Sequence, residues 1–288
     1  MSTPRPLADQ LTAIDCMNTL TLTPECWMDG LTQSCDRLRH AWSVAWPGLD
    51  AVAAACSQTL DLHSNADPAV VGLCSFMQSV CLEMERRAAA APQDEEPAYH
   101  NRLHTADVLV GLTTLLHAQH AGREAGSRLW SAALLAAAAA HDFGHPGGVN
   151  QQRFDFESRS WAGVCQYAGA VPPQWREHIE SLILRTDPQV VPDNHQQVMN
   201  QPFSWDRPWC QVLLNEADIL LSATSRFGPG LSTALAREWQ RCGFAPHATV
   251  ATPQGRAQFL RSVRFSSPAA LALGMAQEVQ EQLQSIAF

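Results

Sequence analysis

The feature that most constrains the fold is a run of small apolar residues in the middle of the chain. Leu134 and Leu135 are followed by five alanines, and the run ends directly before His141 and Asp142. Alanine has the highest helix propensity of the amino acids, and such small side chains let neighbouring helices pack closely. The run therefore predicts a buried core helix. Because the end of a buried helix holds its side chains rigidly, His141 and Asp142 are well placed to bind a ligand.

Helical periodicity continues through nearly the whole chain, and long runs of alternating β-branched residues are missing. We expect an all-α protein, with an N-terminal helical layer at residues 1–95 and a core at residues 96–288 that carries the motifs, together forming one compact unit. Two segments rich in Pro, Asn, Gln and Asp, 187–208 and 243–253, are expected to be loops. The expected helices cover roughly 25–42, 48–63, 67–90, 99–119, 124–141, 173–186, 206–225, 231–241, 254–264 and 268–286.

The composition argues against several classes of partner. The 288-residue chain has a formal net charge of −9, which disfavours broad electrostatic binding of nucleic acid or of an anionic membrane. No uncharged apolar stretch of about 18 residues is present, and the N-terminus lacks the basic-then-apolar pattern of a signal peptide. The nine cysteines are an odd number and form no Cys-x-x-Cys. These features predict a cytoplasmic protein with reduced thiols and with neither a nucleic-acid nor a membrane partner.

Metal-binding residue types are concentrated in two short stretches, 99–107 and 141–150, and recur on a later expected helix. Helices that pack together can aim four of these side chains at one point: His104, His141, Asp142 and Asp218. Two imidazoles and two carboxylates suit Zn²⁺, Mn²⁺, Fe²⁺ or Mg²⁺ and leave positions for water. An adjacent His-Asp pair is natural where Asp142 bridges two metals, an arrangement that supports phosphoryl chemistry. The pattern therefore favours metal-assisted hydrolysis of a phosphoester.

The two stretches also carry a family resemblance. The sequence resembles the HD-domain phosphohydrolase superfamily and within it is most similar to the class I 3′,5′-cyclic-nucleotide phosphodiesterases. The family signatures Tyr-His-Asn-x-x-His-x-x-Asp-Val and His-Asp-x-x-His-Pro-Gly-x-x-Asn are both complete. Weaker counterparts of later family motifs are Thr186-Asp187 and Ala217-Asp218, so the resemblance covers about residues 99–225. The matching residues are Tyr99, His100, Asn101, His104, Asp107 and Val108, then His141, Asp142, His145, Pro146, Gly147 and Asn150.

The resemblance implies an HD/PDEase-like helical bundle with a metal site between helices and two divalent metal ions, Zn or Fe at the first site and Mg or Mn at the second. His104, His141, Asp142 and Asp218 would bind the first metal, with Asp142 bridging to the second. His100 would be the general acid that protonates the leaving O3′, and His145 and Asn150 would be further catalytic residues. Tyr99, Asp107 and Thr186 would surround the ligands or contact the substrate, Asp107 by orienting a histidine.

The sequence departs from the family at two places. The family segment Ser-Val-Leu-Glu-x-His-His, whose glutamate supports the general acid and the water shell of the second metal, is not found. Glu157, Glu177 and Glu180 are candidate replacements, although a glutamate in such a helix is more often a solvated surface charge. The family also places a purine-binding glutamine before a Gly-Phe or Ser-Phe pair. Gln277, Gln280, Gln282 and Gln284 lie on the last expected helix without such a pair, and none of them is assigned.

Three functions remain open at this point. The first is two-metal hydrolysis of cAMP or cGMP to the 5′-monophosphate, with a small-molecule nucleotide as the partner. The second keeps the site but changes the substrate to another phosphoester, such as a modified or linear nucleotide or a dinucleotide. The third is a non-catalytic, metal-stabilised sensor module. A homodimer is compatible with each of them.

Overall fold

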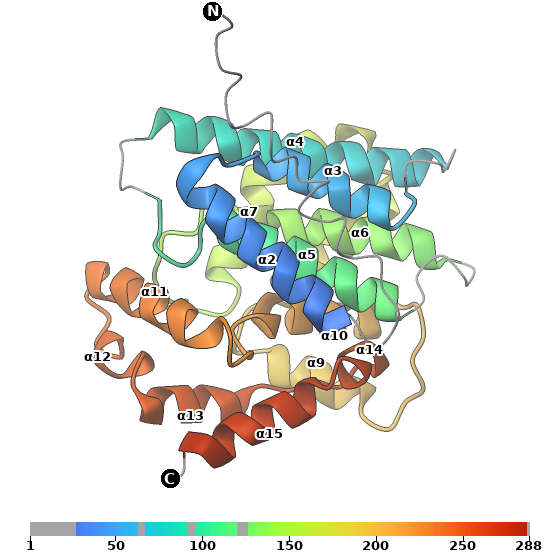
Figure 1. Cartoon of the computed structure of the whole chain (residues 1–288). Coiled ribbons are helices and arrows are strands. Elements are labelled where there is room, and N and C mark those ends of the chain that lie inside the picture. Colours follow the sequence, from blue (N-terminus) through green and yellow to red (C-terminus); the bar gives the residue numbers. More distant parts are fainter. Residues whose placement is uncertain (1–26, 63–66, 92–95, 120–125, 287–288) are drawn as a thin grey trace, which may run out of the picture.

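The structure is a computed structural model that describes residues 27–62, 67–91, 96–119 and 126–286. Within these ranges every regular element is a helix and no strand occurs, which confirms the all-α class (Figure 1). The elements are α2 (Trp27–Val44), α3 (Leu49–Thr59), α4 (Pro68–Ala90), α5 (Arg102–Ala118), α6 (Ser127–Ala140), α7 (Asp155–Val164), η4 (Cys165–Ala170), α8 (Pro173–Leu184), α9 (Val191–Val198), α10 (Arg207–Leu220), α11 (Gly228–Arg241), α12 (His247–Val250), α13 (Pro253–Ser262), α14 (Pro268–Ala272) and α15 (Met275–Ile286).

Side-chain caps define where several of these helices begin. Asp67 accepts a hydrogen bond from the backbone N–H of Ala69 at 2.8 Å at the start of α4. Asn101 accepts from the N–H of His104 at 3.0 Å at the start of α5. Such caps satisfy backbone donors that have no partner inside the helix. The cap at Asn101 therefore holds a motif histidine in the first turn of α5, where its position depends on the helix and not on a loop.

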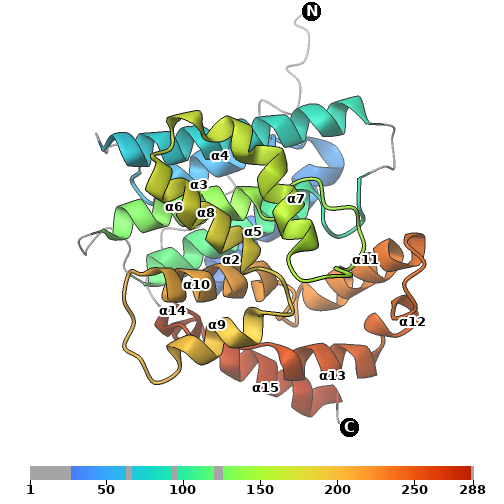
Figure 2. The same cartoon turned by 180° about the vertical axis from the view of Figure 1, so that it is seen from behind.

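The centre of the molecule is the pair α5 and α6. The alanine-rich α6 packs against α4, α5 and α8, while α5 also contacts α2, α3 and α10. Figure 1 shows α2 and α3 on the viewer's side of this pair and α4 along the top of the molecule, and Figure 2 shows α7 and α8 on the opposite side. The buried apolar side chains form one large continuous cluster that includes helices from both parts of the chain. None of the described helices is both long and apolar enough to cross a lipid bilayer.

The C-terminal helices are tied to the end of α10 by a buried arginine. Arg256 of α13 donates to the carbonyl of Thr224 at 2.9 Å, to the carbonyl of Ser222, and to Gln282 Oε1 of α15 at 2.7 Å. A guanidinium can remain buried when its terminal N–H groups are satisfied in this way, although Nε of Arg256 has no partner among the described residues. This link positions the turn after α10, and hence α11, which borders the site described below (Figure 2).

The sequence-based helix assignment was incomplete. Helix α7 and the 3₁₀ turn η4 were not expected, and α9 and α12 lie in segments expected to be loops. The polar composition of α9 conceals packing in which Asn194 is fully buried and donates to Asn215 Oδ1 at 2.7 Å. The expected helix 268–286 is two helices, because Gly274 takes a φ of 72° between them. The described cysteines are free thiols, as expected; Cys16 and Cys26 lie outside the described residues, as does most of the N-terminal end of the expected layer.

Candidate active site

Four ligand-type side chains from three helices meet at one point. His104 lies in α5, His141 and Asp142 directly follow α6, and Asp218 lies near the end of α10. His104 Nε2 is 3.3 Å from Asp142 Oδ2 and 3.1 Å from Asp218 Oδ1. His141 Nε2 is 3.2 Å and 3.5 Å from the same two oxygens. The structure thus brings together all four residues that the sequence assigned to the first metal.

The donor set suits a divalent cation. Ligand atoms about 2.0–2.2 Å from one cation have mutual separations like those between these nitrogens and oxygens. The Nε2 atoms of both histidines are buried and have no hydrogen-bond partner of good geometry among the described residues. His141 Nδ1 lies 2.8 Å from the carbonyl oxygen of Ala138, to which it must donate, so Nε2 is the ring nitrogen that faces the carboxylates and is available to a metal ion.

The two carboxylates strongly polarise the histidines. Burial lowers the pKa of His104, but the facing oxygens of Asp142 and Asp218 outweigh it and raise that pKa to about 9. The pKa of His141 is raised by the same carboxylates against the effect of burial. Conversely, the histidines hold the pKa of both Asp142 and Asp218 below the usual range despite burial. A buried pocket with this charge pattern favours a bound cation.

Next to the ligands lies a histidine–glutamate pair. His100 Nδ1 is 2.5 Å from Glu238 Oε1, and the backbone N–H groups of His100 and Tyr99 donate to Glu238 Oε2 at 2.9 Å and 2.8 Å. Burial raises the pKa of Glu238, but the hydrogen bonds from His100 outweigh it and lower the pKa below its ordinary value. An ionised Glu238 fixes the proton of His100 on Nδ1 and leaves Nε2 to meet a substrate.

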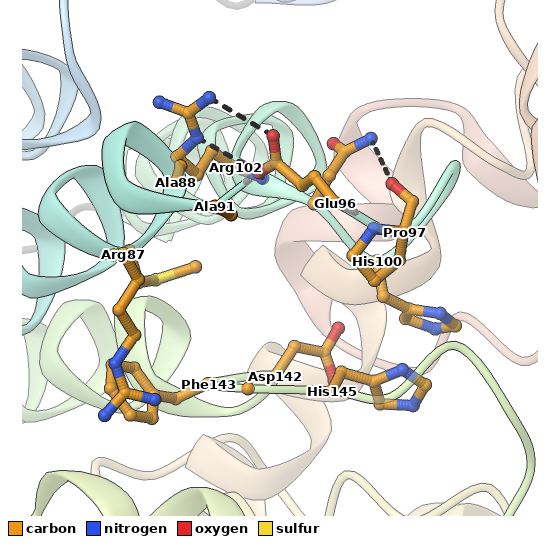
Figure 3. Close-up of a pocket in the computed structure, with 13 residues that line it drawn as sticks. Arg87, Ala88, Ala91, Glu96, Pro97, His100, Arg102, Asp142, Phe143 and His145 are labelled. Atoms are coloured by element: carbon orange, nitrogen blue, oxygen red, sulfur yellow. Dashed lines mark hydrogen bonds and ion pairs between the residues drawn. The ribbon is translucent and has the colours of Figure 1, made fainter. Parts of the chain in front are cut away.

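His145 stacks on this pair. Its ring centroid is 3.8 Å from that of His100, and Figure 3 shows the ring of His145 below that of His100, with Asp142 to the left of both. Burial and the neighbouring His100 lower the pKa of His145 to about 4. Its Nδ1 accepts from the N–H of Gly147 at 3.1 Å, so Nε2 carries the proton. Gly147 has a φ of 83° and its Cβ position is 3.0 Å from Glu238 Cγ, so only glycine lets this turn approach the pair.

On the other side of the ligands lie Asn150, Glu157 and Thr186. The amide of Asn150 donates to both oxygens of Glu157 at 3.1 Å and 2.8 Å, which joins the second motif to α7. Burial raises the pKa of Glu157 to about 7. Thr186 is buried and donates to the carbonyl of Ile183 at 2.8 Å. Asp187 accepts from the N–H of Phe154 at 2.6 Å and so anchors the start of α7.

Tyr99 and Asp107 both lie near the candidate ligand His104. The ring of Tyr99 lies 4.7 Å from the ring of His104, and its hydroxyl is 2.9 Å from Ser222 Oγ. Asp107 is buried and accepts from both terminal nitrogens of Arg39 of α2, at 2.9 Å and 2.6 Å. Its carboxylate therefore faces Arg39, and it makes no hydrogen bond to a histidine among the described residues.

A cavity of about 480 Å³ lies beside the candidate metal ligands, and His100 and His145 are part of its lining. Aromatic side chains from α7, from α11 and from the loop after α11 form one wall of it: Phe156, Trp239 and Phe244. Its size and its mixture of apolar walls and converging polar groups are typical of a small-molecule site. The polar lining comprises Tyr99, His100, Asp142, His145, Asn150, Glu157, Thr186, Asp187, Gln189 and Asp218. Seven of the ten site residues that the sequence selected therefore line one cavity, whereas His104, His141 and Asp107 do not line it.

Glu238 was not found by sequence reasoning. It lies 138 positions after His100, in an amphipathic helix that carries no recognisable motif, so no local signal marks it. Of the three glutamates considered as replacements, Glu157 lines the cavity, whereas Glu177 is exposed and Glu180 half-buried on α8, and neither lines it. None of the C-terminal glutamines reaches the cavity: Gln277, Gln280 and Gln284 are exposed, and Gln282 is bound to Arg256.

Comparisons with known proteins agree with this geometry. The model of the 3′5′-cyclic nucleotide phosphodiesterase family matches residues 99–163, which contain both long motifs. The phosphodiesterase domain of the RhoPDE fusion protein from the choanoflagellate Salpingoeca rosetta is 15% identical, with a TM-score of 0.58 over 82% of this chain and 87% of that chain. The structure of LmjPDEB1 in complex with IBMX is 16% identical, with a TM-score of 0.63 over 88% of this chain and 90% of that chain. No curated protein sequence matches the chain.

At such low identity the solved structures establish the fold, and the matched segment relates the motifs to the family. The expected HD/PDEase-like helical arrangement is confirmed by these neighbours. In both its long motifs and its fold, the chain is similar to the class I cyclic-nucleotide phosphodiesterases of the HD-domain superfamily.

Proposed function

We propose that this protein is a metal-dependent phosphodiesterase that hydrolyses 3′,5′-cyclic nucleotides to 5′-monophosphates with two divalent cations, Zn or Fe at the first site and Mg or Mn at the second. One observation carries the proposal. Four metal-binding side chains lie beside a histidine–glutamate pair, and Asp142 and Asp218 of the first group and His100 of the second line one cavity of about 480 Å³. A metal site that only stabilised the fold would need neither the histidine–glutamate pair nor the cavity.

His104, His141, Asp142 and Asp218 would hold the first cation. Asp142 also lines the cavity, and its Oδ2 makes the contacts with both histidines, so Oδ1 is available to a second cation. When bound, such cations supply the Lewis acidity that activates an attacking water and stabilises charge on the phosphoryl oxygens.

His100 supplies the proton in this mechanism. As the P–O3′ bond breaks, Nε2 of His100 donates a proton to the leaving oxygen, which would otherwise depart as a costly alkoxide. Glu238 holds the ring in the required tautomer and stabilises the protonated form of His100 between turnovers. The neutral His145, with a proton on Nε2, is placed to donate a hydrogen bond to a phosphoryl oxygen.

The walls of the cavity suggest how the base is held. Phe156, Trp239 and Phe244 offer aromatic faces for stacking, whereas one of the two side-chain amides in the lining, that of Asn150, donates its hydrogen bonds to Glu157. Gln189 also lines the cavity but is exposed. A site that stacks a base without buried polar partners discriminates weakly. We therefore expect kcat/KM for cAMP and cGMP to differ by less than about tenfold, roughly 1.4 kcal/mol.

The proposal is tested by incubating the purified protein with cyclic and linear nucleotides in Mg²⁺, Mn²⁺ or Zn²⁺ and separating the products by chromatography. The expected products from cAMP and cGMP are the 5′-monophosphates. Turnover of a linear phosphomonoester without any hydrolysis of cAMP or cGMP would refute the proposal. Absence of turnover on every phosphoester would instead support a metal-stabilised sensor module.

A further inference from the structure

The active site opens on two sides. A second cavity of about 410 Å³ shares His100, Asp142 and His145 with the first and extends away from them toward α4. Figure 3 shows these three side chains at one end of this cavity and Arg87 with Phe143 at the other. Each cavity alone has the volume of a small-ligand site. A cyclic mononucleotide, with its base against the aromatic wall of the first cavity, has no part that extends into the second.

The far end of the second cavity presents a cation. The guanidinium of Arg87 lies 4.2 Å from the centroid of the Phe143 ring, and its Nε donates to Glu83 at 2.9 Å. No described residue accepts a hydrogen bond from its two terminal nitrogens, and Nη1 lies 3.8 Å from the Cβ position of Gly144, beside the metal motif. Stacking and the Glu83 contact orient the fork of Arg87, which is suited to a phosphate.

The other arginine of this cavity is already neutralised. Arg102 donates to Glu96 at 3.0 Å and to Glu85, so both carboxylates occupy its guanidinium. Arg87 is therefore the residue of this lining with donors to spare for an anion.

We propose that the site also accepts linear phosphodiesters, specifically dinucleotides that carry a 5′-terminal phosphate, with the leaving nucleoside in the second cavity and its terminal phosphate on Arg87. This inference rests on the proposed phosphodiesterase function. The reason lies in the position of His100, which lines both cavities and donates its proton to the leaving O3′. In a cyclic substrate that oxygen stays on the same ribose, whereas in a linear substrate a second nucleoside must extend past His100.

The same chemistry applies to both substrate types. For the dinucleotide pApA, the oxygen of water bonds to phosphorus and the P–O3′ bond breaks. The leaving O3′ takes a proton from His100, and the proton released by the water restores His100. One pApA and one water thus give two molecules of 5′-AMP, while ApA, which lacks the terminal phosphate, gives adenosine and 5′-AMP.

The test measures kcat/KM for pApA, ApA and cAMP with the wild-type protein, Arg87→Ala and the matched control Arg86→Ala. Arg86 directly precedes Arg87 in α4 and also donates to Glu83, at 2.7 Å, but it does not line the cavity. We expect Arg87→Ala to lower the ratio of kcat/KM for pApA to kcat/KM for ApA about tenfold, which is the effect of losing one charge-assisted hydrogen bond. Arg86→Ala should leave the ratio unchanged.

A second pair of variants tests the cavity itself. Ala88 lines it and Ala89, one position further along α4, does not. Ala88→Phe should slow pApA and ApA alike, by at least tenfold relative to cAMP, and Ala89→Phe should not. Hydrolysis of cAMP without hydrolysis of pApA, or a pApA to ApA ratio equal in wild type and Arg87→Ala, overturns this inference and leaves the proposed function intact. Failure to hydrolyse cAMP and cGMP counts against the proposed function and is read separately.

Discussion

The four candidate metal ligands, here called the ligand cluster, lie beside the histidine–glutamate pair His100–Glu238, here called the acid pair. The two groups are built in different ways. The ligands come from α5, the end of α6 and α10, helices that pack against one another in the centre of the molecule. The acid pair joins His100, just before α5, to Glu238 on the peripheral α11. The comparison suggests that metal binding is a property of the core, while proton transfer depends on how the C-terminal helices dock.

The largest effect is expected for Asp142→Ala. Asp142 faces both ligand histidines and the cavity, so its loss should remove most of the bound transition metal and all detectable hydrolysis. Metal content by elemental analysis and product formation from cAMP measure the two effects. Asp155→Ala removes a partly exposed carboxylate whose ion pair within the described part of the chain is with Arg159, and it serves as the control. Full activity of Asp142→Ala at normal metal content would rule out the bridging role.

A smaller loss is expected for His100→Ala, because this residue belongs to the acid pair and not to the ligand set. The variant should keep its metal and its fold but lose about 10²–10⁴ in rate, the usual cost of removing a general acid. Part of the rate should return on p-nitrophenyl phosphodiesters, whose leaving group needs little protonation. An equal loss on both kinds of substrate would mean that His100 positions the substrate instead.

Glu238→Gln separates orientation from proton transfer. The amide keeps the size of the side chain but no longer stabilises a protonated His100, so we expect a loss of about tenfold or more, below that of His100→Ala. As with His100→Ala, the loss should shrink on p-nitrophenyl phosphodiesters, and the metal content should stay at the wild-type level. Glu180→Gln, on α8 and outside the cavity, is the matched control. A loss of metal in Glu238→Gln would show that α11 also supports the ligands, and the proposed division between core and periphery would then be wrong.

The smallest effect is expected at Glu157, the carboxylate of α7 that lines the cavity beside the candidate ligands. Burial raises the pKa of Glu157 to about 7, from an ordinary value of 4.5. The stability that protonated Glu157 contributes is therefore complete when the pH is below its ordinary pKa of 4.5, and it is lost as the pH rises through about 7. The glutamine of Glu157→Gln stays neutral at every pH. When both proteins are free of metal, the variant should therefore melt a few degrees above wild type near pH ~8, and the two melting temperatures should be close near pH ~5. A constant difference in melting temperature across this range would contradict the assignment.

Local sequence was enough to identify much of the site. The spacing of His100 and His104 and the His-Asp pair at the end of an alanine-rich helix are patterns within a few residues, and the structure places these side chains together. The helical class followed in the same way from periodicity. Short polar helices such as α9 were missed, because they are stabilised by buried contacts such as that of Asn194 with Asn215 and not by their own composition.

The amino-acid sequence by itself predicted the all-α class from helical periodicity, and it predicted the four candidate ligands and the candidate acid from short motifs that resemble those of a known family. Only the tertiary structure decided that Glu238 is the partner of His100, that Asp107 faces Arg39, and that the site opens toward Arg87 as well as toward the aromatic wall. These features join segments far apart in the chain. Their geometry follows from how the helices pack, and no single segment carries a signal for it.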